Sequence, residues 1–281
     1  MKFRKANKNT NFGSFGPYDL LKKIGSGSSS NIWHGRSRDD GSECAVKILN
    51  RESASRKIML DNFLKEIEIL KSINHKRVSK IINVIKHNGK LGIIMTLESG
   101  VPLTDIISDV PMGLEQVLSI VEPLASCLDH MHLKKIAHRD IKPANILYDE
   151  EFGPKLIDFG ISDFIERSYE GEKPHRMGSD FWMAPEQADH RRTSIKTDNY
   201  SFAMLLYRLL TGGYPWESGL PAEEVEKLKI SDSLIPIQDK NEHLGEELCS
   251  IIMSGLSNDP DKRPSSCLSM VKKIKDEINE N

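Results

Sequence analysis

The spacing of apolar residues changes near residue 99, and this change limits the folds that the chain can adopt. Strand-like runs with turn signals between them, such as RDDGS and HNGK, occupy the part before it. These runs cover residues 18–25, 31–37, 43–49, 79–87 and 90–98. Neighbouring strands joined by short turns pair antiparallel, so we expect an antiparallel meander.

One helix is expected to interrupt the meander, over DNFLKEIEILKSI at residues 61–73. Apolar residues recur there at helical spacing: Phe63, Leu64, Ile67, Leu70 and Ile73. Asp61 is the expected N-cap. The first domain, residues 18–98, is therefore predicted to be a small sheet with one helix packed on it.

The part from residue 99 to residue 281 has the 3.6-residue period of helices. The predicted helices cover residues 115–133, 197–211, 221–229, 245–256 and 266–278. Residues 136–195, between the first two, combine loop with short strands. A segment of that length inside a compact domain is usually functional.

Composition and charge exclude several classes of protein. The 39 basic and 41 acidic residues leave a net charge of -2, which favours no nucleic-acid partner. The richest apolar run, residues 202–210, contains Arg208 and is shorter than the roughly 20 residues of a membrane span. The four cysteines lack CxxC spacing, so reduced thiols and a cytoplasmic location are expected. Residues 1–17 are basic without an apolar core, and we expect a disordered extension.

A glycine- and serine-rich stretch, IGSGSSSNIW at residues 24–33, can be a flexible linker or a phosphate-binding loop. Composition alone favours the linker. Position favours the loop, because the stretch lies between two predicted strands, where a linker has no place.

Four short motifs follow in a fixed order: AVK (45–47), HRDIKPANIL (138–147), DFG (158–160) and APE (184–186). With them, the chain from about Tyr18 to its C-terminus resembles the eukaryotic-type protein kinase family. The resemblance implies an α+β, two-lobed fold with an N-terminal antiparallel sheet and a larger, mainly helical C-terminal lobe. It also implies transfer of the γ-phosphoryl group of ATP to protein substrates, with Mg²⁺ as cofactor and autophosphorylation.

The same resemblance assigns the charged residues. Lys47 corresponds to the strand lysine that contacts the α and β phosphates, and Glu66 to the helix glutamate that pairs with it. Asp140 is expected to accept the proton of the substrate hydroxyl. Lys142 is expected to neutralise the transferring phosphate. The expected magnesium ligands are Asn145 and Asp158.

The resemblance also predicts the nucleotide contacts. Gly25 and Gly27 correspond to the phosphate-covering hairpin, in which Ser30 replaces the third glycine and reduces the freedom of the tip. The adenine base is expected beside the backbone of residues 96–98 and the following side chains: Ile24, Ile32, Ala45, Met95, Leu97 and Leu147.

Other residues that match the family are expected to stabilise the fold and to take no part in the chemistry. His138 and Phe159 are assigned to an apolar column with Leu70. Asp198 is expected to bind the backbone of the catalytic loop, and it can cap its own helix at the same time. A buried ion pair is expected between Glu186 and Arg263.

Serine/threonine specificity is inferred from Lys142 and Ser179, and dual specificity stays open. A pseudokinase or scaffold is disfavoured because the charged set is complete. A small-molecule kinase is disfavoured by the APE segment and Arg263. A monomer is the default, and neither the substrate nor the oligomeric state follows from the sequence.

Two further expectations concern regulation and substrates. Arg139 precedes the catalytic aspartate, but His175 stands where relatives often carry an activating phosphate, so we expect built-in activity. Secondary modulation is assigned to Ser168 or Tyr169, and Glu170 or Glu172 are possible built-in anions for Arg139. Pro102, Ala144 and Arg208 stand where arginine-selecting kinases carry acidic residues. We therefore expect a mild preference for acidic residues before the acceptor, unless Arg208 pairs within the chain.

Overall fold

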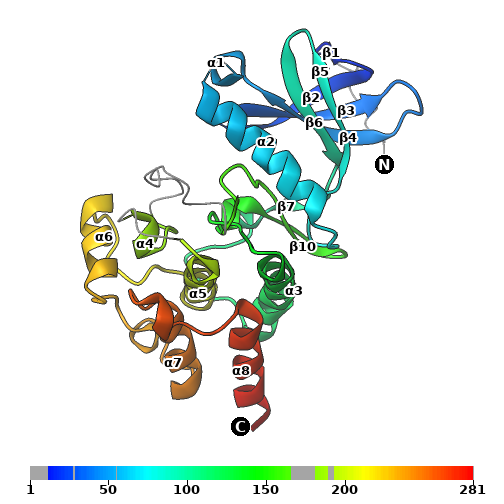
Figure 1. Cartoon of the computed structure of the whole chain (residues 1–281). Coiled ribbons are helices and arrows are strands. Elements are labelled where there is room, and N and C mark those ends of the chain that lie inside the picture. The colour runs from blue at the N-terminus through cyan, green and yellow to red at the C-terminus, as the bar shows by residue number, and fades with distance from the viewer. Residues whose placement is uncertain (1–11, 28, 55, 166–180, 189–192, 281) are drawn as a thin grey trace. The chain divides into compact units, whose positions relative to one another are not determined.

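The computed structural model describes residues 12–27, 29–54, 56–165, 181–188 and 193–280. The chain divides into two compact units. The N-terminal unit contains Met1–Ser72 and Ser79–Glu98, and the C-terminal unit contains Ile73–Val78 and Ser99–Asn281. The chain passes into the C-terminal unit for the last time after Glu98. Figure 1 shows the elements of each unit.

The N-terminal unit is built on one six-stranded sheet in which all neighbours pair antiparallel. Its strands, in the order β1-β2-β3-β4-β6-β5, are β1 (Ser14–Phe15), β2 (Tyr18–Ser26), β3 (Ser30–Ser37), β4 (Glu43–Leu49), β6 (Lys90–Thr96) and β5 (Ile81–His87). Two helices, α1 (Arg51–Ala54) and α2 (Lys57–Ser72), lie between β4 and β5 in the chain. The predicted meander with an inserted helix is therefore confirmed.

The alternation of side chains along β4 decides which residues meet α2. Leu49 packs with Phe63 and Ile67 of α2, on the sheet face that the helix covers. Val46 points to the opposite face, into a cluster with Tyr18 and other side chains. Because successive strand residues point to opposite faces, Lys47 lies on the same face as Leu49, toward α2.

Three sequence predictions in this unit are wrong. Helix α2 begins at Lys57, so Asp61 is not its N-cap; the amides of Met59 and Leu60 already donate to the Arg56 carbonyl at 3.0 and 3.2 Å. Leu64, predicted to be buried, is 48% exposed, because the buried face of α2 follows Phe63 and Ile67 instead.

The predicted disordered extension is also wrong for its last residues, because β1 pairs with β2. Phe15 is buried over Gly92, where a Cβ would come within 2.4 Å of its ring. This packing fixes residues 14–17 on the sheet. Residues 1–11 lie outside the described residues.

The C-terminal unit is mainly helical. Its helices are α3 (Leu114–Leu133), α4 (Pro185–Ala188), α5 (Ile195–Thr211), α6 (Ala222–Ile230), α7 (Glu246–Gly255) and α8 (Cys267–Glu280). Short strands form a β10-β9-β7 sheet, with β7 (Val101–Pro102), β9 (Ile146–Asp149) and β10 (Gly153–Leu156), and a β11-β8 pair, with β8 (Ile136–Ala137) and β11 (Asp163–Phe164). The five long predicted helices are confirmed.

Helix α5 forms the centre of this unit. It lies among α3, α7 and α8 and contacts all three (Figure 1). Nearly all of its residues are buried. Its buried residues include polar ones such as Asp198 and Asn199, which need hydrogen-bond partners inside the unit. Among the described residues, no helix combines the length and the hydropathy that a membrane crossing needs.

Candidate active site

The backbone of the HRD segment is fixed by one buried carboxylate. Asp198, in the first turn of α5, is 0% exposed. Its Oδ2 accepts a hydrogen bond from the backbone N–H of His138, and its Oδ1 accepts one from that of Arg139, each at 2.8 Å. The predicted contact with the catalytic loop is confirmed. The additional role, a helix cap, is wrong because Ser194 caps α5.

A third partner of Asp198 was not predicted from the sequence. His132, in the last turn of α3, places its Nε2 2.8 Å from Asp198 Oδ2. Burial alone would raise the pKa of Asp198, but the hydrogen bonds and charges of His132 and His138 and the Arg139 amide outweigh it, so the pKa lies below its usual range. The carboxylate therefore stays ionised and joins two helices to the loop.

The loop itself adopts a conformation that is uncommon for residues with side chains. Arg139 has a φ of 69°, and its carbonyl accepts a hydrogen bond from Gln187 Nε2 at 2.9 Å. Asp158 of the DFG motif has a φ of 64°. Left-handed backbone at a non-glycine residue costs on the order of 1 kcal/mol and persists only where the surroundings impose it. Here the contacts to Asp198 and Gln187 impose it at Arg139.

The two carboxylate oxygens of Asp140 differ in their hydrogen bonding. Its Oδ2 accepts from Lys142 Nζ at 2.7 Å and from Asn145 Nδ2 at 2.8 Å. Its Oδ1 is buried and has no hydrogen-bond partner among the described residues. A carboxylate fixed in this way can receive a proton at Oδ1 without turning.

The two predicted magnesium ligands lie on neighbouring backbone segments. Ile157, which precedes Asp158, donates its N–H to the Asn145 carbonyl at 2.9 Å. Asn145 uses its Nδ2 toward Asp140, while the Asp158 carboxylate is exposed. An amide oxygen and an exposed carboxylate are hard ligands that suit Mg²⁺. The residues therefore fit the ion that the family implies.

The N-terminal unit contains the predicted lysine–glutamate pair. Lys47 Nζ lies 2.5 Å from Glu66 Oε1, and the two residues are 4% and 3% exposed. Lys47 reaches the glutamate because its strand position points to α2. In this structure α2 thus lies close enough to β4 for the pair to form.

The glycine-rich stretch forms the hairpin between β2 and β3. Gly25 stands opposite Ile32, and the register shifts between Lys23 and Gly25. A Cβ at Gly25 or Gly27 would approach its nearest neighbours to 3.4 and 3.7 Å, which is ordinary contact, and neither glycine has a positive φ. The hairpin itself does not require these glycines. Without side chains, Gly25 and Gly27 leave the backbone of the hairpin accessible, as a phosphate-covering loop needs.

The predicted adenine contacts fall in both units. Ile24, Ile32, Ala45, Met95 and Leu97 belong to the N-terminal unit, and Leu147 to β9 of the C-terminal unit. Ile24 is 48% exposed, which is unusual for isoleucine and suits a ligand-facing position. Ala45 is buried and pairs with Met95 across β4 and β6. Their role toward a nucleotide base stays a prediction.

Two structural predictions in the C-terminal unit are confirmed. Arg263 Nη1 and Nη2 each lie 2.8 Å from a different oxygen of Glu186, and both residues are 2% exposed. The rings of His138 and Phe159 meet edge to face, with centroids 4.9 Å apart, which confirms this part of the predicted column. The place of Leu70 in the column stays a prediction.

Arg139 has a carboxylate partner that was not predicted. Arg139 Nη1 lies 3.3 Å from Asp163 Oδ2, and both side chains are 10% exposed. The residues that we had considered, Ser168, Tyr169, Glu170, Glu172 and His175, lie outside the described residues, as does Ser179. Asp163 follows the DFG motif by three residues, but nothing marks an aspartate in a loop as a partner for Arg139.

The chain belongs to the protein kinase domain family, whose sequence model matches residues 18–275. It is 32% identical over 247 residues to a probable serine/threonine-protein kinase of Clostridium perfringens, which covers 88% of this chain and 36% of the relative. It is 28% identical to the serine/threonine-protein kinase pkn2 of Myxococcus xanthus, over 89% of this chain and 31% of the relative.

A third relative, the serine/threonine-protein kinase PrkC of Bacillus subtilis, is 28% identical over 92% of this chain and 40% of its own length. The chain thus spans about a third of the length of the curated relatives it matches. The match and the observed elements confirm the predicted α+β protein-kinase fold class.

Proposed function

We propose that the chain is a protein kinase that transfers the γ-phosphoryl group of ATP to serine or threonine hydroxyls of protein substrates. The observation that carries this proposal is the geometry of Asp140, with Oδ2 held by Lys142 and Asn145 and a buried Oδ1 without a partner among the described residues. The family and the names of the relatives support the same activity.

In the proposed reaction, Asp140 orients the acceptor hydroxyl and takes its proton. The hydroxyl oxygen forms a bond to the γ-phosphorus as the bond from that phosphorus to the bridging oxygen breaks, so that ADP leaves. Lys142 Nζ, 2.7 Å from Asp140 Oδ2, supplies positive charge next to the transferring group.

The remaining residues of the proposal hold the nucleotide. Lys47, oriented by Glu66, is assigned to the α and β phosphates, and the β2–β3 hairpin covers the phosphates. Asn145 and Asp158 are assigned to Mg²⁺, which when bound neutralises charge on the triphosphate. Their exposed or amide oxygens support this assignment.

We further place the protein in the cytoplasm. Its four cysteines are buried free thiols. Burial raises the pKa of Cys44 to about 11 and that of Cys127 to about 12, so both stay protonated and unreactive at neutral pH. Such thiols suit a reducing compartment.

Mass spectrometry after incubation with Mg-ATP and a generic protein substrate tests the proposal. We expect phosphoserine and phosphothreonine on the substrate and on the chain itself, and none with Asp140→Asn. Phosphotyrosine at a comparable level would establish dual specificity instead. Nucleotide binding without any transfer would identify a catalytically silent scaffold.

A further inference from the structure

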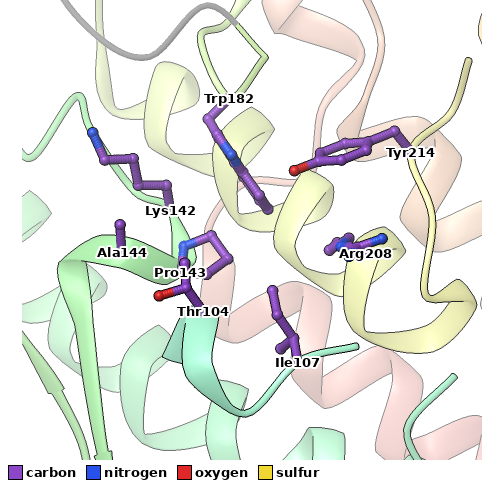
Figure 2. Close-up of a pocket in the computed structure, with 8 residues that line it drawn as sticks. All are labelled: Thr104, Ile107, Lys142, Pro143, Ala144, Trp182, Arg208 and Tyr214. Atoms are coloured by element: carbon purple, nitrogen blue, oxygen red, sulfur yellow. The ribbon is translucent and has the colours of Figure 1, made fainter. Parts of the chain in front are cut away.

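A pocket of about 230 Å³ opens beside the catalytic loop, entirely within the C-terminal unit. Figure 2 shows that Lys142, Pro143 and Ala144 of that loop form one side of it, with Arg208 and Tyr214 on the other. Lys142 is the residue whose Nζ contacts Asp140 at 2.7 Å. An occupant of the pocket therefore lies next to the loop that carries Asp140, the proposed catalytic base.

The charge of the pocket favours an anion. Two of its eight lining residues, Lys142 and Arg208, are cations, and none is acidic. Lys142 is already paired with Asp140, so Arg208 is the cation left to recognise a ligand. Its guanidinium carbon lies 5.1 Å from the centre of the Tyr214 ring. Stacking on a ring fixes the plane of a guanidinium and leaves its N–H edges for hydrogen bonds.

The present partner of Arg208 is easy to replace. Arg208 Nη2 donates to Asp109 Oδ1 at 3.0 Å, so the internal pairing that the sequence left open as the alternative for Arg208 exists. The Arg208 side chain is 12% exposed, however, while that of Asp109 is 95% exposed. An ion pair with one fully hydrated member contributes little free energy. Arg208 Nε is buried without a hydrogen-bond partner among the described residues, which leaves a donor that a second carboxylate oxygen can satisfy.

The backbone of Asp109 is held independently of this ion pair. Gly212 has a φ of 71°, and a Cβ there would come within 2.5 Å of the Asp109 backbone. The Met112 N–H also donates to the Leu209 carbonyl at 2.8 Å. The loop that carries Asp109 is thus packed on the end of α5 by its main chain, and its carboxylate can move away without unfolding the loop.

We propose that this pocket binds an acidic side chain, aspartate or glutamate, that lies near the phosphorylated residue in the acceptor protein. The side chain takes the place of Asp109 on Arg208, and the Trp182 and Tyr214 rings enclose its aliphatic part. The inference rests on the proposed kinase function and names the substrate class of that site.

A positional-scanning peptide array with Mg-ATP tests the proposal on the whole 281-residue chain. We expect one position to favour aspartate or glutamate over alanine by about three- to tenfold, the range for a partly exposed charge-assisted hydrogen bond. Arg208→Gln removes this preference. Asp109→Asn increases it by about twofold, because the internal competitor is lost. With Asp109→Asn, phosphorylation of peptides without acidic residues stays within about twofold of that by the unmodified chain.

The matched control is Lys275→Gln on α8, which removes the same charge from an exposed ion pair with Glu122 on α3. It leaves the acidic preference unchanged. Circular dichroism and thermal unfolding establish that each variant is folded. If Arg208→Gln does not fold, Arg208→Lys keeps the charge without the planar fork and is expected to reduce the preference to about half.

A second readout separates this inference from the proposed function. Fluorescence polarisation without ATP compares the binding of an acidic peptide with that of its alanine counterpart. Selective binding that depends on Arg208, without phosphoryl transfer, would support the pocket and contradict the kinase function. Transfer with a preference for basic or aromatic residues, or an acidic preference that survives Arg208→Gln, would overturn the pocket alone. Neither transfer nor selective binding would overturn both.

Discussion

Arg263 donates two parallel hydrogen bonds to Glu186, from a position 77 residues later in the chain. Thr197 adds its hydroxyl to the same carboxylate at 2.9 Å, and the guanidinium also donates to the Lys196 and Ser257 carbonyls at 2.8 Å. One buried contact thus joins the APE segment, the start of α5 and the residues before α8.

Removing one partner of this contact should destabilise the C-terminal unit strongly. Arg263→Ala leaves the charge of Glu186 buried without its partner, and we expect the free energy of unfolding to fall by about 3–5 kcal/mol. Urea denaturation followed by tryptophan fluorescence measures it. Lys227→Ala, which breaks an exposed pair with Glu224, is the control and should cost less than about 0.5 kcal/mol. A loss below about 1 kcal/mol for Arg263→Ala would contradict the prediction.

Asp140→Asn should abolish most phosphoryl transfer and leave ATP binding nearly intact. Asparagine can keep the hydrogen bonds to one oxygen but cannot take the proton of the acceptor. We expect the transfer rate to fall by about 10² to 10⁴. Steady-state kinetics and calorimetric titration with ATP measure the two quantities, and Asp276→Asn, on the exposed side of α8, is the control. Near-normal turnover with unchanged ATP affinity would show that another group accepts the proton.

Glu66→Gln should lower turnover strongly and change the thermal stability of the fold only slightly. The amide keeps the shape of the glutamate but loses the charge that orients Lys47, at 2.5 Å. We expect turnover to fall by about tenfold or more, with a shift of only a few degrees in the midpoint of thermal unfolding. Glu68→Gln, on the exposed face of the same helix, should behave like the unmodified chain. Equal turnover in both variants would remove Glu66 from the site.

The stability of the chain should fall as the pH drops below about 6.5, partly because of His138. Burial lowers the pKa of His138, against the opposite effects of Asp198, Asp140 and Asp158. In this window the unfolded chain binds a proton that the folded chain does not, so protonation favours unfolding. His138→Phe should therefore lose less stability between pH 6.5 and 5 than the unmodified chain. Urea denaturation at several pH values measures both slopes, and equal slopes would contradict the assignment.

Phosphatase treatment should leave basal activity largely unchanged. Arg139 already faces the carboxylate of Asp163 at 3.3 Å, which provides the negative charge that a phosphate supplies in other kinases. Asp163→Asn should reduce activity, and the reduction should persist after incubation with Mg-ATP. If phosphatase abolishes activity and phosphorylation of one loop residue restores it, the activity is not built in.

The sequence predicted those parts of the fold and of the candidate site that depend on local periodicity and on short motifs. Lys47 is an example, because the alternation in AVKIL places it on the face of Leu49 and toward the helix that carries Glu66. Asp198 is another, since its motif indicated a contact with the catalytic loop.

Residues whose partners are distant backbone groups could not be predicted in this way. Lys229 is 2% exposed and donates to the carbonyls of Phe181 and Met183, at 2.9 Å each, although its helix has the composition of a solvated one. His132 likewise depends on α5 to bring Asp198 to it. The start of α2 was missed because the turn at Arg56 carries no recognisable capping residue.

The hydrogen bonds from the His138 and Arg139 amides to Asp198 should slow the exchange of these two amide protons with solvent. Those two N–H groups lie in a loop without regular secondary structure, where amide protons ordinarily exchange with solvent within seconds to minutes. Here each can exchange only when the first turn of α5 separates from the loop, so both protons should exchange as slowly as those in the middle of α5. The loop that carries the proposed catalytic base is therefore expected to unfold together with α5, nearly all of whose residues are buried.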